Sequence, residues 1–438
     1  MIQLKIIKEM EKIAKNRIKK LIDSLNKNSE CASLLISAAE APFRSHDQLY
    51  PFRQNSDFFY FTLCGNSRGV HLLLRSDYKR PLLFCEKQDA ENRVWEGRLH
   101  DGKKIASLIG AELIETNKLE TEIFAAIRGY STFYFQSDQS TLSFRIMRRL
   151  SEMRAFEAER LLGYPRKLIS ASLVISPLRM IKDAHEVEAI KTSIKLTNQA
   201  IREAAREIAV GISEFQIRAI LDFFFALHNG VPAFATIVAS GGSAATLHHR
   251  TSAQLIKRND FVLIDCGCEL NGYASDISRT FPAAKRFEKW QRLLYLGVLR
   301  AQMEAIKKIR AGVKIRTIYL AAVEVLTETL LELRVIKGRL AYLIKSEAFK
   351  PFFPHGIGHL LGIDVHDVGQ MRGNLDFILQ KDMVITIEPG LYFSKPIGLV
   401  LAGGVRIEDN ILVGAKGAEI LSSNIPKTIE EVEAFLLN

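Results

Sequence analysis

Two aspartates, Asp265 and Asp276, stand at either end of a predicted β-hairpin. The apolar run Phe261–Ile264 leads into Asp265, and Asn271-Gly272 between the two aspartates is a strong turn signal. A two-residue loop at that turn pairs Asp276 with Gly267, whereas a four-residue loop sets Asp265 directly opposite Asp276. Because side chains alternate along a strand, both registers place the two carboxylates on one face of the sheet. This pattern indicates a metal ion between them; the alternative is a solvated turn with two surface aspartates.

The second half of the chain carries further metal-ligand residue types at the ends of strand-like runs or in a glycine-rich loop. His355, His359 and His366 are separated by glycines, which let the backbone approach a site closely. Glu388 ends the run DMVITIE, and Glu408 lies on the run VRIED. One histidine with four carboxylates is an oxygen-rich set that suits Mn²⁺, Co²⁺ or Zn²⁺. Four carboxylates also balance two divalent cations, which bridging carboxylates would hold roughly 3.5–4 Å apart. Taken singly, each residue has an ordinary alternative as a solvated or core side chain.

Composition and length limit the kinds of protein that this chain can be. The chain has 438 residues, 47% of them hydrophobic and 25% charged, which is typical of a globular protein large enough for two domains. It has no apolar run near the ~20 residues that cross a bilayer, and no signal peptide is visible, so we expect a cytoplasmic protein without a membrane partner. The five cysteines are expected to be free thiols. Cys266 and Cys268 are expected to pack in the core rather than bind metal.

The net charge of +11 raises the hypothesis of a nucleic-acid partner. Basic residues between 5 and 20 follow a predicted amphipathic helix, but acidic residues are interleaved with them and no aromatic cluster lies nearby. A solvated helix face is therefore the expected explanation, and no nucleic-acid partner is expected.

The order of predicted elements divides the chain into two domains. A helix over residues 1 to about 25 is followed by short apolar strands that alternate with helices, which is typical of an α/β domain. Pro177 is expected to break the chain, and we place the boundary at 174–178, which gives domains 1–175 and 176–438. In the second domain, long helices followed by carboxylate-bearing strands occur twice, which suggests an internal duplication. The predicted long helices cover 183–210, 213–228, 288–310 and 315–333, and a short closing helix is expected within 425–438.

The ordered set Asp265, Asp276, His359, Glu388 and Glu408 resembles the metal ligands of the pita-bread metallopeptidases of family M24, which include aminopeptidase P, prolidase and methionine aminopeptidase. Four local motifs are similar to the bacterial aminopeptidase P branch: DCGCELNGYASDISRTFP (265–282), HGIGHLLGIDVHDVG (355–369), TIEPGLYF (386–393) and GVRIEDNILV (404–413). In the first domain, YPFRQNSDFFYFT (50–62) and RVWEGRL (93–99) look like that branch too. The resemblance covers nearly the full chain. It implies an α/β N-terminal domain followed by an α+β pita-bread catalytic domain.

The departures from the family pattern are small. Leu63-Cys64 separates Thr62 from the glycine that often follows it directly, and His249 stands where the family usually has tyrosine after the histidine. Gly358 precedes His359 where serine is common. These differences concern the detail of the substrate pocket and leave the metal-ligand set complete.

The resemblance implies a role for each ligand. Asp276 and Glu408 are expected to bridge two metal ions, Asp265 to complete the shell of one ion, and His359 with Glu388 to complete that of the other. Two such ions lower the pKa of a shared water, so that hydroxide is available near neutral pH to attack the carbonyl of the first residue.

The resemblance also implies roles beyond the metal ions. Glu388 is expected to relay a proton to the departing nitrogen. His248 and His366 are expected to stabilise the tetrahedral intermediate by donated hydrogen bonds. His355 and Arg406 are expected to line the proline pocket. For Arg406, neutralisation of the neighbouring glutamate is an equally weighted alternative.

The implied function is that of a cytoplasmic metallo-aminopeptidase that removes an N-terminal residue preceding proline. Its expected cofactors are two divalent ions, Mn²⁺ in the first place, with Co²⁺ or Zn²⁺ as alternatives. Its expected partners are peptides with proline at the second position and copies of the same chain in a homodimer or homotetramer. The nearest alternative is a prolidase, which accepts only dipeptides, and the motif at 50–62 favours aminopeptidase P. A metal-free pita-bread protein that binds peptides is a further alternative, but the complete ligand set counts against it.

Overall fold

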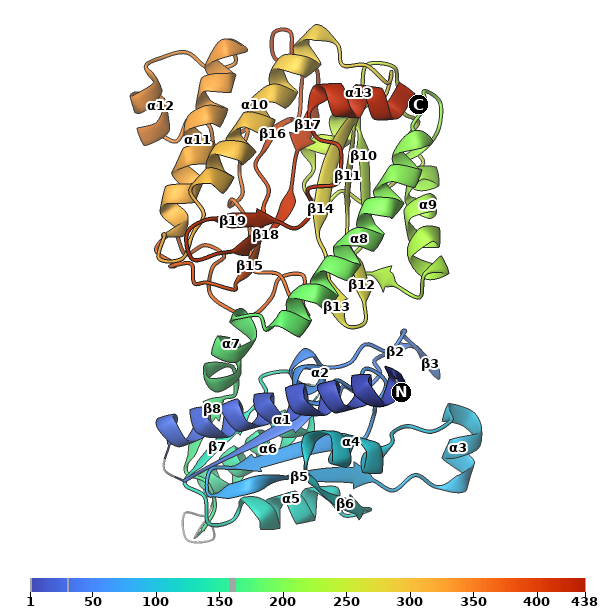
Figure 1. Cartoon of the computed structure of the whole chain (residues 1–438), viewed down its shortest axis with the longest axis vertical. Helices are drawn as coiled ribbons and strands as arrows, with labels where there is room; N and C mark the ends of the chain where they lie inside the picture. The colour runs from blue at the N-terminus through green and yellow to red at the C-terminus, as the bar shows by residue number, and fades with distance from the viewer. Residues whose placement is uncertain (1, 30, 140, 157–162, 438) are drawn as a thin grey trace. The chain divides into compact units, whose positions relative to one another are not determined.

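The computed structural model describes residues 2–29, 31–139, 141–156 and 163–437. The chain divides into two compact units, residues 1–179 and residues 180–438. Each unit has its own sheets and helices, as Figure 1 shows.

The first unit is built on a six-stranded sheet in the order β6-β5-β4-β1-β7-β8. β1 runs antiparallel to β4 and parallel to β7, so the sheet is mixed, as is common in α/β domains. The apolar runs predicted as strands form β1, β4, β5 and β7. The sheet strands are β1 (Ala32–Ser37), β4 (Val70–Arg75), β5 (Tyr78–Glu86), β6 (Glu112–Thr116), β7 (Thr132–Phe135) and β8 (Lys167–Ser170), and a small hairpin adds β2 (Phe43–Ser45) and β3 (Gln48–Leu49).

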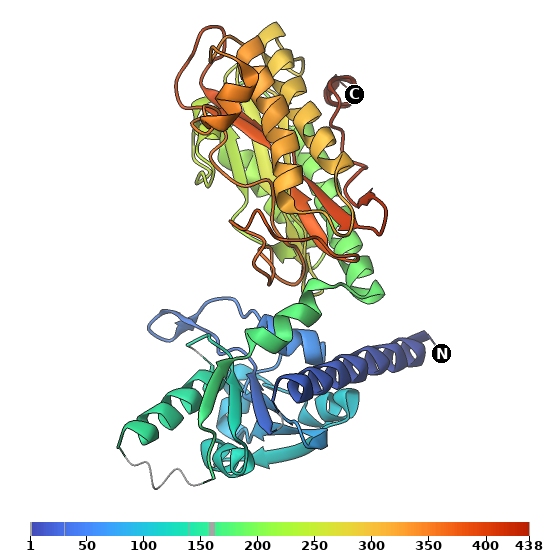
Figure 2. The same cartoon turned by 90° about the vertical axis from the view of Figure 1, so that its left-hand side faces the viewer.

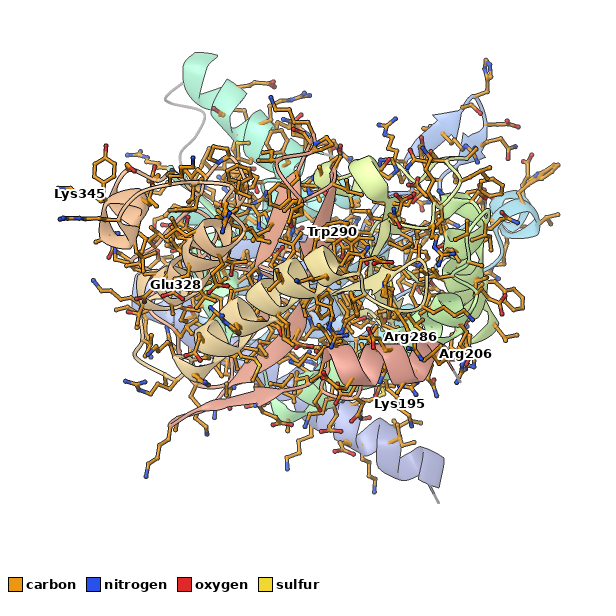
Figure 3. The ribbon with its side chains drawn as sticks, turned by 90° about the horizontal axis from the view of Figure 1, so that it is seen from above. Lys195, Arg206, Arg286, Trp290, Glu328 and Lys345 are labelled. Carbon is orange, nitrogen blue, oxygen red and sulfur yellow. The ribbon has the colours of Figure 1, made fainter. Side chains whose placement is uncertain are left out.

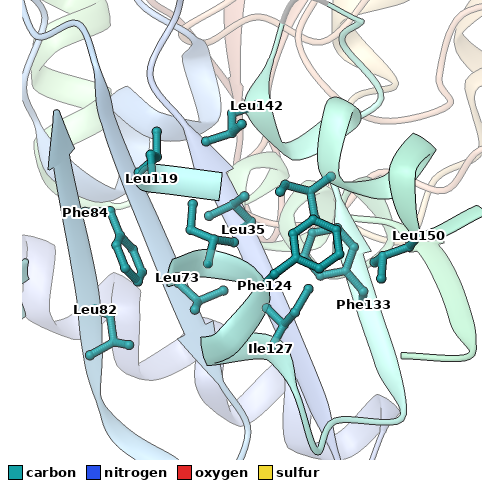
Figure 4. Packing of buried hydrophobic residues seen from close by; sticks show 12 residues of the cluster. Leu35, Leu73, Leu82, Phe84, Leu119, Phe124, Ile127, Phe133, Leu142 and Leu150 are labelled. Carbon is teal, nitrogen blue, oxygen red and sulfur yellow. The ribbon is translucent and has the colours of Figure 1, made fainter. Parts of the chain in front are cut away.

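Helices cover both faces of this sheet, and Figure 2 shows α1 and α6 on opposite faces. The N-terminal helix predicted from the sequence is present as α1. One core cluster joins α5 and α6 to the strands, and Figure 4 shows Phe124 and Leu150 among its members. The helices of this unit are α1 (Ile2–Asn28), α2 (Ser56–Thr62), α3 (Ala90–Glu96), α4 (Gly102–Ile109), α5 (Leu119–Ile127), α6 (Leu142–Phe156) and α7 (Ser172–Met180).

Pro177 does not break the chain as the sequence predicted, because it lies inside α7. A proline within a helix removes one backbone hydrogen bond and clashes with the carbonyl four residues earlier. Buried Val174 and Ile175 anchor the helix on its apolar side, so α7 continues past the proline to Met180. The two compact units divide at 179/180, directly after the predicted boundary region of 174–178.

The second unit contains the two pairs of long helices predicted from the sequence. α8 packs against β12 and β13, α9 against β10, and α10 against β15, β16 and β17, so the helix pairs flank the strands (Figure 1). Charged side chains such as Arg206, Glu328 and Lys345 lie on these helices (Figure 3). The helices are α8 (Ala184–Arg206), α9 (Glu214–Leu227), α10 (Lys289–Lys307), α11 (Ile315–Glu332), α12 (Leu340–Lys345) and α13 (Ile429–Leu437), with a short 3₁₀ helix η1 (Gly241–Ala245).

The strands of the second unit form small antiparallel sheets in the orders β10-β11-β14, β13-β12-β9, β15-β18-β19 and β16-β17. Their bounds are β9 (Val231–Pro232), β10 (Ile237–Ser240), β11 (Phe261–Cys266), β12 (Cys268–Leu270), β13 (Tyr273–Ala274), β14 (Ile277–Pro282), β15 (Val384–Ile387), β16 (Gly390–Phe393), β17 (Gly403–Arg406), β18 (Asp409–Val413) and β19 (Ala418–Ile420). The order of long helices followed by strands occurs twice, as predicted.

The aspartate hairpin has the register of the two-residue loop. Leu270 pairs with Tyr273 across Asn271-Gly272, and Asp265 pairs with Ser278. Asn271 and Gly272 both have positive φ angles, 52° and 78°, which asparagine and glycine tolerate in a tight hairpin turn. The four-residue loop, which would have set Asp265 opposite Asp276, is therefore wrong.

Two further predictions concern the cysteines and the membrane. All five cysteines are free, and Cys266 and Cys268 are fully buried, which confirms that they pack in the core. Among the helices of the described residues, none combines the length and the apolar character needed to cross a membrane.

Candidate active site

Three of the predicted ligands lie together in the interior of the second unit. Asp276 precedes β14, Glu408 lies between β17 and β18, and His359 belongs to the glycine-rich loop. One ligand atom from each of the three lies within 4.8 Å of the other two, and all three residues are buried. The Asp276 Oδ2 atom is 3.3 Å from His359 Nε2.

The ring of His359 is oriented as in a metal ligand. Its Nδ1 lies 3.1 Å from the carbonyl oxygen of Leu360, and because a carbonyl only accepts, Nδ1 carries the proton. Nε2 then presents a lone pair toward two carboxylates, Asp276 Oδ2 at 3.3 Å and Glu388 Oε1 at 3.7 Å. A lone pair and two carboxylates repel one another unless a cation lies between them. Metal-binding histidines usually donate their other ring N–H to a carbonyl or carboxylate in this way.

Asp265 and Glu388 complete the predicted set from two different strands. Asp265 lies on β11, and its buried Oδ1 atom has no hydrogen-bond partner among the described residues. Glu388 follows β15, remains partly exposed, and its Oε1 accepts a long hydrogen bond of 3.5 Å from the Thr386 hydroxyl. An unpaired buried carboxylate oxygen is costly in a protein interior. The orphaned oxygen of Asp265 therefore fits a cation that this donor set would hold.

The pKa shifts of the cluster also indicate a cation site. Burial raises the pKa of Asp276 well above its ordinary value, and the neighbouring charges of Asp265 and Glu388 raise it further. Burial and then the charge of Asp276 raise the pKa of Glu408 in the same direction. Carboxylates this close without a cation are driven toward the neutral form. A divalent cation at this position would hold them ionised, and the hard oxygen donors suit such an ion.

Arg406 compensates part of the negative charge from within the site. Its Nη2 donates to Asp265 Oδ2 at 2.6 Å, its Nε to the Ser278 hydroxyl at 2.8 Å, and its Nη1 to the Tyr392 hydroxyl at 3.0 Å. The Ser278 hydroxyl in turn donates to Glu408 Oε2 at 2.7 Å. These contacts favour the alternative in which Arg406 neutralises site carboxylates. The residue it pairs with is Asp265, because Glu408 is reached only through Ser278.

Ser278 and Tyr392 are site residues that the sequence prediction did not single out. Ser278 lies two residues after Asp276 and therefore shares its sheet face, which is a signal the sequence does contain. Tyr392 lies within the motif TIEPGLYF, but only the packing of β16 on β17 shows that its hydroxyl meets Arg406.

His355 is held beside the cluster by Tyr392. Its Nδ1 lies 2.8 Å from the Gly356 carbonyl oxygen and so carries the proton, which leaves Nε2 to accept from the Tyr392 hydroxyl at 2.8 Å. Burial lowers the pKa of His355, which favours this neutral form. Its Nδ1 is 3.9 Å from Glu388 Oε2, so the ring lies next to the predicted proton carrier.

The two remaining histidines lie nearer to solvent. His366 stacks edge-on against His359, with 4.3 Å between the ring centroids. Desolvation lowers the pKa of His366, and the nearby rings of His359 and His248 lower it further when they are protonated. His248 is exposed on the loop that follows η1. The structure thus brings all of the predicted site residues into one region of the second unit.

Comparison with known proteins agrees with this geometry. Residues 188–415 match the model of metallopeptidase family M24, and residues 14–134 match that of the aminopeptidase P N-terminal domain. The Xaa-Pro aminopeptidase of Escherichia coli (strain K12) is 31% identical over 413 residues, which cover 93% of this chain and 94% of that protein.

Solved structures show the same fold over nearly the whole length. Proline aminopeptidase P II from Yersinia pestis superposes with a TM-score of 0.89 at 30% identity, covering 98% of this chain and 100% of that one. A zinc-substituted aminopeptidase P of Escherichia coli in complex with product gives 0.89 at 29% identity, covering 98% of each chain. The fold is therefore the predicted one, an α/β N-terminal domain with an α+β pita-bread catalytic domain. The chain belongs to metallopeptidase family M24 and carries an aminopeptidase P N-terminal domain.

Proposed function

We propose that this metallopeptidase removes the N-terminal residue from peptides whose second residue is proline. The observation that carries the proposal is the buried cluster of Asp276, His359 and Glu408, whose ligand atoms lie within 4.8 Å of one another. The relatives named Xaa-Pro aminopeptidase and aminopeptidase P match over more than nine-tenths of the chain, in both domains.

The five carboxylate and imidazole side chains are proposed to hold two divalent ions, with Asp276 and Glu408 shared between them. Four carboxylates against one neutral histidine and one arginine leave a negative charge that two divalent cations offset. Mn²⁺ is our first proposal for both positions, with Co²⁺ or Zn²⁺ as alternatives, since all three accept oxygen donors with one imidazole. When bound, such ions supply an activated water and polarise the scissile carbonyl.

The chain's own residues have distinct proposed tasks around these ions. Glu388 accepts a proton and passes it to the leaving nitrogen, a task that fits its partly exposed carboxylate beside the cluster. His248 and His366 donate hydrogen bonds to the oxygen that becomes negative in the transition state. The leaving nitrogen belongs to proline and has no N–H before the bond breaks, so recognition depends on the shape of the pocket.

The substrate pocket is proposed to include His355. The ring is fixed from both sides, by the Gly356 carbonyl and the Tyr392 hydroxyl, so it offers a rigid wall rather than a mobile donor. For Arg406 we retain the predicted pocket role through its hydrogen bond to the Tyr392 hydroxyl, because each of its three nitrogens already donates to one of Asp265, Ser278 and Tyr392.

The cellular setting and the assembly of the chain are also proposals. Five free cysteines, three of them buried, suit a reducing compartment such as the cytoplasm. We propose a homodimer or homotetramer in which the first unit supplies the contact surface. Val94 and Trp95 on α3 are 83% and 81% exposed, so they are available to this proposed surface.

The test compares Xaa-Pro-Yaa tripeptides with Xaa-Pro dipeptides in the presence of Mn²⁺, with and without a chelator. We expect cleavage of the tripeptide after the first residue and loss of that activity on chelation. Cleavage of dipeptides alone would replace the proposal with a prolidase, and full activity after complete metal removal would exclude metal-dependent hydrolysis.

A further inference from the structure

The loop that carries His248 connects β10 to the segment before β11. It leaves β10 at Ser240, forms η1, and returns at Ser252. Within the described part of the chain, the ring of His248 forms no hydrogen bond, and the residue is exposed. The position of this ring therefore depends on the backbone of the loop.

A buried carboxylate closes the base of this loop. Glu214, the first residue of α9, has no exposed surface. Its Oε1 accepts from the backbone N–H of Ser240 at 2.7 Å and from the Ser240 hydroxyl at 2.9 Å. Its Oε2 accepts from the backbone N–H and the hydroxyl of Ser252, at 3.1 Å and 2.9 Å. The two oxygens of one carboxylate thus hold the two ends of the loop.

His249 adds a fifth donor to the same carboxylate. Its Nε2 lies 2.8 Å from Glu214 Oε2, and because an ionised carboxylate only accepts, this nitrogen carries a proton. Burial opposes ionisation of Glu214, but the hydrogen bonds from His249, Ser240 and Ser252 outweigh it and hold the pKa of Glu214 below its ordinary value. The N-terminus of α9 also favours a negative charge there.

The returning arm of the loop is also bound to the start of α9. The N–H groups of Glu214 and Phe215 donate to the carbonyl oxygens of Gln254 and Ser252, each at 3.1 Å. The Gln254 amide donates to the Ser240 carbonyl at 2.8 Å, which ties the two arms together. The base of the loop is therefore rigid, and the link from Glu214 to His249 extends this rigidity to the residue next to His248.

We propose that Glu214 and His249 are positioning residues that set the place of His248 in the active site. Glu214 is fully buried, so it acts through the loop and not on the substrate. The inference rests on the role proposed above for His248 as a hydrogen-bond donor to the transition state. It gives His249, which stands where the family usually has tyrosine, a role in the placement of His248.

The first test removes the link at His249. His249→Leu loses the donor, whereas His249→Gln can place an amide N–H near the position of Nε2. We expect His249→Leu to lower kcat on a tripeptide about 10- to 100-fold, the cost of a misplacement of about 1 Å, and His249→Gln to recover most of it. Metal content is measured in every variant and should stay at the parent level. His228→Leu is the matched control, because the His228 ring lies at the far end of α9, where it contacts the carbonyl oxygen and the ring of Phe224; its kcat should not change.

The second test is a double-mutant cycle with His248→Ala. It separates a positioning role of His249 from a merely structural one, because a structural role would lower kcat equally with and without the His248 ring. If His249 acts through His248, then His249→Leu costs nothing further in kcat once His248 is alanine. An unchanged kcat in His249→Leu, or an undiminished loss in the His248→Ala background, would overturn the positioning role. An unchanged kcat in His248→Ala itself would instead remove the role proposed for His248. Should His249→Leu not fold, His249→Asn, whose amide is too short to reach Glu214, takes its place in the cycle.

Discussion

The Nε2 lone pair of His359 faces two carboxylates. Because these groups lie so close together, the ionisation of each ligand depends on the charges of the others. Asp276 Oδ2 lies 3.3 Å from that nitrogen, and the pKa of Glu408 is raised by burial and by the charge of Asp276. Such a cluster is stable in its ionised form only around a cation. The loss of a carboxylate that we propose to be shared between two ions should therefore lower the metal content as well as the rate.

We predict that Asp276→Ala and Glu408→Ala each release at least one of two bound ions and lose most of the activity. Removal of one shared carboxylate leaves two cations facing each other with less compensation. The measurement is metal stoichiometry by mass spectrometry after desalting, alongside kcat. Asp376→Ala is the control, because Asp376 is an exposed partner of Lys314 and Arg316. Two tightly held ions in both site variants would contradict the shared position of these carboxylates.

At the scale of the elements, a buried ion pair fastens the glycine-rich loop to the segment before α8. Lys182 Nζ lies 2.7 Å from Asp367 Oδ2, and their side chains are 0% and 2% exposed. Asp367 follows His366 directly in the chain. Removing one partner of such a buried pair takes away the nearest opposite charge from the partner that stays, which is costly in a protein interior.

We predict that Lys182→Met lowers the free energy of unfolding of the second unit by about 3–5 kcal/mol. The addition of Asp367→Asn should recover part of this loss, because the buried carboxylate that had lost the Lys182 ammonium is then neutral. The chain has two tryptophans, so a Trp95→Phe background leaves Trp290 on α10 as the reporter of urea unfolding. The control is Lys381→Met, whose partner Asp382 is 42% exposed and whose loss should cost at most about 1 kcal/mol. Equal effects of the two substitutions would contradict the prediction.

Local sequence signals predicted the elements better than they predicted the contacts between them. The Asn271-Gly272 turn fixes the hairpin because its two positive φ angles are a property of those residues. The sequence left the two-residue and four-residue loops open, and both kept the aspartates on one face. Pro177 misled the prediction because a single lost hydrogen bond can be outweighed by the buried residues beside it.

The contacts that organise the site could not be read from periodicity. Arg406 reaches Asp265 across 141 positions of sequence, and Lys182 reaches Asp367 across 185. Strand alternation predicts which face a side chain lies on, but it does not say which other strand packs against that face. The anchor of His249 on Glu214 depends likewise on how a loop returns to the start of a helix 35 residues earlier.

At the scale of the whole molecule, every proposed ligand lies in the second of the two compact units. The ligands run from Asp265 to Glu408, within residues 180–438, and the first unit has its own core around Leu35 and Phe133. Ligand binding stabilises only the structure that contains the site, by about 2.7 kcal/mol when the free ion is at a hundred times its dissociation constant. Metal binding should therefore protect the two units unequally.

We predict that chelation raises amide hydrogen exchange in β11, β14 and β15 of the second unit and leaves β1 and β4 of the first unit unchanged. The physical reason is that core strands exchange through global opening of their own unit, and only the second unit loses the stabilisation of the bound ions. Exchange followed by mass spectrometry, with and without chelator, resolves the strands separately. Asp276→Ala supplies the matched control, because chelation should add little to its exchange once its metal affinity is lost. An equal rise in β1 and β4 would show that the two units open together as one cooperative body.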